Sequence, residues 1–136
     1  MPCHARYGLG MACRISEVVL RCHDPDALAR FWCAVLDFVE LGREEGTYVG
    51  IGPRAGFGGP QPVLVLIRDD DPKNGPARLH LDVNATDRDQ DAELERLLSL
   101  GAHPADVGQT GREPWHVLAD PEGNEFCLLD TRLAPL

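Results

Sequence analysis

Three side chains of metal-binding types lie in three separate, largely apolar stretches of the chain. These residues are Glu17, His80 and Glu125. Each stretch has the character of a β-strand, in which every second side chain points to the same face. If the apolar side chains pack on a core, all three residues point to the opposite face. One imidazole and two carboxylates suit a divalent ion such as Mn, Fe, Co, Ni or Zn, and three protein ligands leave positions for water or substrate.

The stretch around His80 shows the alternation most clearly. Leu79, Leu81 and Val83 make one face, and His80 and Asp82 make the other. Asp82 therefore shares the face of His80. There it can orient the imidazole through a hydrogen bond, or pair with a neighbouring arginine instead.

The strands that carry Glu17 and Glu125 follow the same rule. Val18 and Leu20 are expected to pack on the core in the first strand, which leaves Glu17 facing out. Phe126 packs in the last strand, which turns Glu125 and the cysteine after Phe126 to the opposite face. The three candidate ligands are therefore expected to look into whatever space the sheet encloses.

Each candidate ligand also has an ordinary structural role. A glutamate near the start of a strand, such as Glu17, is commonly solvated at a sheet edge. Glu125 follows a Gly-Asn turn, where it can be exposed. A single histidine on the polar face of a strand usually binds no metal. The spacing alone leaves a metal site and a solvated polar face as open alternatives.

Short strands and two helices are expected to position these residues. Asp24 can cap a helix with Pro25 in its first turn. A second helix is expected to begin at Thr86 or Asp87 and to end at Gly101. The expected strands are residues 15–22, 38–41, 47–51, 63–67, 78–83, 102–107, 115–119 and 125–129.

The order of elements repeats once along the chain, as a strand, a helix and then three strands in each half. The sequence predicts a single domain over residues 14–132. It consists of module one (about 14–68), a solvated connector (69–77) and module two (about 78–130). Residues 1–13 show no periodicity and are expected to form a flexible leader.

Composition and charge exclude several classes of protein. The 136 residues carry 13 Lys and Arg against 22 Asp and Glu, a net charge of −9, which opposes binding to nucleic acid. No apolar run approaches the roughly 18–20 residues needed to cross a bilayer, and the N-terminus has no signal-peptide core. The five cysteines form no CxxC pair, so reduced thiols and a cytoplasmic location are expected.

Several segments resemble the vicinal oxygen chelate superfamily, which includes glyoxalase I, bleomycin-resistance proteins and extradiol dioxygenases. The matching segments are residues 17–20 (EVVL), 24–25 (DP), 31–36 (FWCAVL), 79–83 (LHLDV) and 115–127, which contains DPEGNEF. The resemblance implies an α+β fold in which two βαβββ modules form a curved mixed sheet, a cup that holds a divalent metal ion.

By position in that fold, the resemblance implies Glu17, His80 and Glu125 as the metal ligands. The remaining ligand position of glyoxalase I falls near residues 62–65, which carry no metal-binding side chain. The implied function is a metal-dependent enzyme of lyase, isomerase or dioxygenase type, acting on a small oxygenated metabolite. In such an enzyme Glu125 or Glu17 can act as the base.

The same resemblance leaves a second class of function open. A metal-independent protein that sequesters a small molecule, such as an antibiotic, would use Trp115, Tyr48 and Phe57 to line the cup. His116 lines the cup or faces solvent, depending on a register that the sequence does not determine. A catalytically inactive scaffold is the third alternative. Relatives often complete the cup across two copies, which implies a homodimer.

Overall fold

The computed structural model describes residues 13–136, so the expected leader lies outside the described residues except for Cys13. Ten helices and strands follow one another along the described chain. In chain order they are β1 (Glu17–Cys22), α1 (Pro25–Leu36), β2 (Val39–Glu44), β3 (Tyr48–Gly52), β4 (Val63–Arg68), β5 (Leu81–Val83), α2 (Gln90–Leu100), β6 (His103–Pro104), β7 (His116–Ala119) and β8 (Glu125–Leu128).

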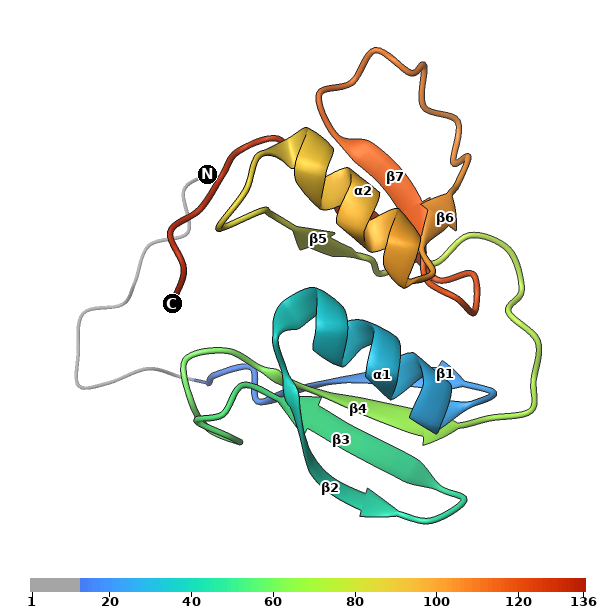
Figure 1. Ribbon diagram of the computed structural model, residues 1–136. Coiled ribbons are helices and arrows are strands. Elements are labelled where there is room, and N and C mark those ends of the chain that lie inside the picture. Colours follow the sequence, from blue (N-terminus) through green and yellow to red (C-terminus); the bar gives the residue numbers. More distant parts are fainter. Residues whose placement is uncertain (1–12) are drawn as a thin grey trace.

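The eight strands form two four-stranded sheets with the same topology (Figure 1). The strand orders are β1-β4-β3-β2 and β5-β8-β7-β6. In each sheet the first and last strands of a module pair in parallel, and the other pairs are antiparallel. The expected α+β fold of two βαβββ modules is confirmed.

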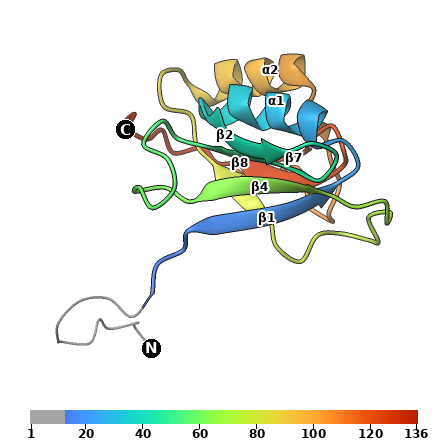
Figure 2. The same cartoon turned by 90° about the horizontal axis from the view of Figure 1, so that it is seen from below.

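The two modules share one core, which lies on the helical side of the sheets. Figure 2 shows α1 and α2 side by side on the same side of the strands. Trp32 of α1 packs edge-on against Phe126 of β8, with 5.0 Å between ring centroids, and Leu97 of α2 joins the same cluster. Trp32 is therefore a core residue. Neither helix covers the opposite face of the sheets, which we call the open face.

The helices begin and end at capping residues. Asp24 accepts a hydrogen bond from the Ala27 N–H (3.1 Å), as the sequence predicts. The second helix begins later than Thr86 or Asp87, because Asp89 is the residue whose carboxylate accepts from the first turn. Gly101 ends it with φ +119°, a backbone conformation that favours glycine.

The DPEGN turn fastens module two to module one. Asp120 is fully buried and accepts hydrogen bonds from Trp32 Nε1 (3.1 Å) and from the side-chain amide of Asn124 (2.9 and 3.0 Å). The Glu122 carboxylate accepts from the backbone N–H groups of residues 23 and 24, at 2.6 and 2.8 Å. The most specific motif of the resemblance therefore links the two modules through side-chain hydrogen bonds.

Two expected strands are shorter than the alternation predicts. The strand expected from residue 78 begins only at Leu81, and Leu79 is 73% exposed instead of packing on the core. The Ala77 N–H donates to the Glu125 carboxylate, so the chain before Leu81 is held by a side chain and not by a strand ladder. The strand expected over residues 102–107 comprises only two residues.

The described cysteines, Cys13, Cys22, Cys33 and Cys127, are free thiols. Burial, and then the nearby Glu122 carboxylate, raises the pKa of Cys22 to about 12. Between residues 13 and 136, no helix is long and apolar enough to cross a membrane.

Candidate functional site

The strand registers place Glu17 and Glu125 on the open face, and His80 directly precedes β5. Val18 and Leu20 pack against the core, so Glu17 points the other way and is exposed. In module two, Phe126 is buried, which turns Glu125 to the open face of β8. The expected division of each strand into a core face and an open face is confirmed for β1 and β8.

The three residues do not gather within one copy of the chain. Glu17 lies on β1, opposite Val63 of β4, whereas Glu125 lies on β8 of module two and His80 directly precedes β5 of that module. In the part of the chain that the structure describes, the group of His, Cys, Asp or Glu side chains that could hold a metal ion contains His80 but neither Glu17 nor Glu125. Within one copy, these three residues therefore do not form a metal site.

The Glu125 carboxylate forms an ion pair with a lysine side chain. Lys73 of the connector donates to this carboxylate at 2.8 Å, and the Ala77 N–H donates to the other oxygen at 3.2 Å. The Glu125 side chain is only 16% exposed. Burial on its own raises the pKa of Glu125, but the Lys73 ammonium and backbone hydrogen bonds together hold its pKa below the usual value.

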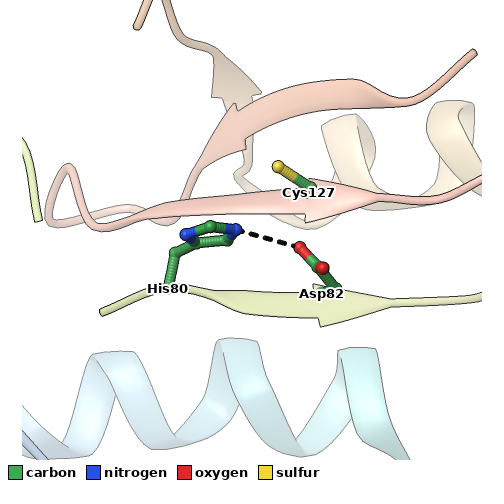
Figure 3. A group of neighbouring side chains, drawn as sticks. All are labelled: His80, Asp82 and Cys127. Carbon is green, nitrogen blue, oxygen red and sulfur yellow. Dashed lines mark ion pairs between the residues drawn. The ribbon is translucent and has the colours of Figure 1, made fainter. Parts of the chain in front are cut away.

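His80, Asp82 and Cys127 form a cluster on the open face of module two, drawn in Figure 3. His80 Nε2 lies 3.1 Å from Asp82 Oδ1, and Asp82 lies directly opposite Cys127 in the β5–β8 register. Burial raises the pKa of the Cys127 thiol, and the Asp82 carboxylate raises it further by its charge and its hydrogen bond. The pairing of His80 with Asp82, one of two alternatives in the sequence, is the one observed.

Comparison with known protein families identifies the family of this chain. A family model described as a glyoxalase-like domain matches residues 17–129, most of the chain. The chain belongs to this family. It is thereby a member of the vicinal oxygen chelate superfamily, as its motifs predict. A comparison of this chain with curated protein sequences found no match.

Solved structures of this superfamily share the fold of the glyoxalase-like domain. A glyoxalase/bleomycin resistance protein/dioxygenase family enzyme from Burkholderia phytofirmans PsJN is 17% identical, with 83% of this chain and 94% of that chain covered and a TM-score of 0.62. Fosfomycin resistance protein FosX from Mesorhizobium loti is 17% identical, with 90% and 95% covered and a TM-score of 0.63.

A FosX variant from Listeria monocytogenes, complexed with Mn(II) and 1S,2S-dihydroxypropylphosphonic acid, is also similar. It is 14% identical, with 88% of this chain and 90% of that chain covered and a TM-score of 0.66. At these identities the likeness establishes the fold of the glyoxalase-like domain. Which of its side chains bind a ligand has to be argued from the domain's own residues.

The aromatic residues expected to line one ligand pocket lie in different places in the glyoxalase-like domain. Trp115 and His116 line a hollow of about 250 Å³ beside Leu94 and Leu98 of α2. His116 pairs with Leu128, a core residue, so its side chain points to the helical face and not to the open face.

The other two expected pocket residues lie in module one. Tyr48 pairs with Ile67 and lines a different hollow, of about 360 Å³, near the start of α1. Phe57 is 64% exposed and lines neither of these two hollows. The four residues therefore do not form one pocket within a single copy.

The sequence pattern identified only part of the chemistry at the open face. Cys127 and Asp82 occupy same-face positions that alternation predicts, but nothing in the sequence pairs one with the other, because strand pairing is non-local. Lys73 gives no signal at all, since it lies in a polar connector 52 residues before Glu125.

Proposed function

We propose that this glyoxalase-like domain is a divalent-metal-dependent enzyme that acts on a small oxygenated metabolite as a homodimer. In each of its two sites, Glu17 of one copy faces His80 and Glu125 of the other copy. The observation that carries the proposal is that Glu17 and Glu125 point to open faces although they belong to different sheets.

The open faces support a homodimer. Both helices occupy the other side of the sheets, so a single copy leaves the open faces without a covering element of its own (Figure 2). Val19, next to Glu17 on the outward side of β1, is 56% exposed. A second copy that covered this face would bury apolar surface and bring two open faces together around the ligands.

The donor set fits a divalent ion. One imidazole and two carboxylates are suited to Mn²⁺, Fe²⁺, Co²⁺, Ni²⁺ or Zn²⁺, and Mn(II) is the ion in the FosX complex. When bound, the ion would polarise adjacent oxygens of the substrate as a Lewis acid. Glu125 or Glu17 would take a proton from the neighbouring carbon. For Glu125 to act, the Lys73 ammonium has to leave its carboxylate.

Binding of Mn²⁺ tests this proposal before any substrate is known. We expect the wild-type protein to bind Mn²⁺ and His80→Ala to bind it at least about tenfold more weakly, because one of three ligands is lost. His116→Ala is the matched control, since it removes an imidazole from the helical face of the same sheet. Titration calorimetry measures both. Equal affinity of wild type and His80→Ala for Mn²⁺ would contradict the metal site.

The Lys73–Glu125 ion pair makes a second prediction. We expect Lys73→Met to strengthen Mn²⁺ binding about two- to fivefold, because a cation that competes for Glu125 is removed from a partly exposed pair. Arg78→Met is the matched control, because it removes one positive charge from the chain just after the connector. If Lys73→Met and Arg78→Met bind Mn²⁺ with the same affinity, the Glu125 carboxylate is not a ligand of the ion.

The same ion pair favours a second candidate function. Glu125 with its charge compensated by Lys73 has no need of a metal ion, which suits a metal-independent binder of small molecules. In that case protein purified without chelator contains no stoichiometric metal, and a planar ligand quenches the fluorescence of Trp115, which is 42% exposed. Stoichiometric metal that disappears both in His80→Ala and in Glu17→Ala decides for the enzyme.

A further inference from the structure

A nitrogen, an oxygen and a sulfur donor meet on the open face of module two within one copy of the chain. These donors belong to His80, Asp82 and Cys127, and one ligand atom of each lies within 4.8 Å of the other two. We infer that these three side chains form a binding site for a thiophilic divalent cation of the Zn²⁺ class. The site needs neither Glu17, nor Glu125, nor a second copy.

The distances are close to those of a loaded site. Ligand atoms around a tetrahedral Zn²⁺, at about 2.0–2.3 Å from the ion, lie roughly 3.5 Å from one another. His80 Nε2 and Asp82 Oδ1 are already 3.1 Å apart. Movements of about 1 Å, within reach of side-chain rotation alone, therefore bring the three donors around one ion.

The backbone holds the donors in register. Asp82 and Cys127 are direct partners in the parallel pair β5–β8. His80 lies just before β5, and its Nε2 atom is 3.1 Å from Asp82 Oδ1. Figure 3 shows the Asp82 carboxylate on β5 and the His80 imidazole on the segment that leads into it, beside the strand of the cysteine. Asp82 and Cys127, which lie on paired strands, therefore vary less in position than ligands on loops do.

The chemistry of the donors selects the ion. A thiolate favours Zn²⁺ and related ions over Mn²⁺ and Mg²⁺, which prefer oxygen. The cluster places the Asp82 carboxylate directly opposite the sulfur of Cys127 on the paired strand. The nearby Lys73 ammonium is bound to Glu125. A cation between Asp82 and Cys127 would supply the positive charge that the pair lacks.

The inferred site shares one side chain with the proposed catalytic site. His80 belongs to both sets of ligands, and its Nε2 atom can bind only one ion at a time. Zn²⁺ held by His80, Asp82 and Cys127 would therefore take this ligand away from Glu17 and Glu125. Binding of a thiophilic ion to one copy would compete with binding of Mn²⁺ between two copies.

Titration of the reduced full-length protein with Co²⁺ tests the inference, because a Co²⁺–thiolate bond gives a charge-transfer band in the near ultraviolet. We expect the wild-type protein to show this band, and Cys127→Ser to lose it and to bind Zn²⁺ at least about tenfold more weakly. Cys33→Ser is the matched control. It changes another half-buried thiol, on α1, and should keep the band.

Further variants separate this inference from the proposed function. Asp82→Asn should keep the sulfur band but need a higher Co²⁺ concentration to saturate it. Glu17→Gln and Glu125→Gln should leave the band unchanged while they weaken Mn²⁺ binding. A wild-type protein without the band, or a Cys127→Ser protein that keeps both the band and a wild-type circular dichroism spectrum, overturns the inference and leaves the Mn²⁺ proposal untouched.

Discussion

Asp120→Ala is expected to lower the free energy of unfolding by about 3–5 kcal/mol, because it leaves several buried donors without an acceptor. Asp120 has no exposed surface. Its carboxylate accepts from Trp32 Nε1 at 3.1 Å, from the Glu122 N–H at 2.9 Å and from the Asn124 N–H at 3.0 Å. The same group shapes the DPEGN turn and links it to α1, so both the turn and the contact between the modules depend on it.

Urea unfolding followed by circular dichroism measures this loss. Asp130→Ala is the matched control, because it removes an exposed aspartate just beyond β8, and we expect a change within about 0.5 kcal/mol. Trp32→Phe keeps an aromatic ring in the core but removes one donor to Asp120, with an expected loss between those of the two aspartate variants. A loss below about 1 kcal/mol for Asp120→Ala would show that the hydrogen bonds of Asp120 contribute little to stability.

A heterodimer of one Glu17→Ala chain and one His80→Ala chain is expected to bind about one Mn²⁺, against about two for the wild-type dimer. Each variant alone should bind none with high affinity. In a two-fold dimer whose sites combine Glu17 of one copy with His80 of the other, one site of the heterodimer receives both damaged residues. The second site receives both intact residues and is whole.

Co-expression with two different affinity tags isolates this heterodimer for metal analysis. A site built within a single chain predicts the opposite result, since each chain of the heterodimer lacks one ligand and no site is intact. A heterodimer of Glu44→Ala and His116→Ala chains is the control and should bind Mn²⁺ as the wild type does. Zero Mn²⁺ in the first heterodimer therefore rejects a site shared between copies, whatever the affinity of the wild type.

The fold and the facing of the strands could be predicted from the sequence because both follow from local periodicity. Alternation placed Glu17 and Glu125 opposite the partly buried Val18 and the buried Phe126 side chains, and the structure confirms this. Periodicity was misleading at Leu79, which continues the pattern of the strand but lies outside it, 73% exposed. The Glu125 carboxylate accepts a hydrogen bond from the Ala77 N–H there, and this contact joins distant parts of the chain.

The sequence by itself determined the two βαβββ modules, the residues that point to the core and the family. Only the tertiary structure decided which polar groups meet. It separated Glu17 from His80 and Glu125, joined Glu125 to Lys73, and turned His116 toward the helices. The physical reason is that the direction of a side chain depends on its neighbours in the chain, whereas its partner depends on which strands pair and how the modules pack.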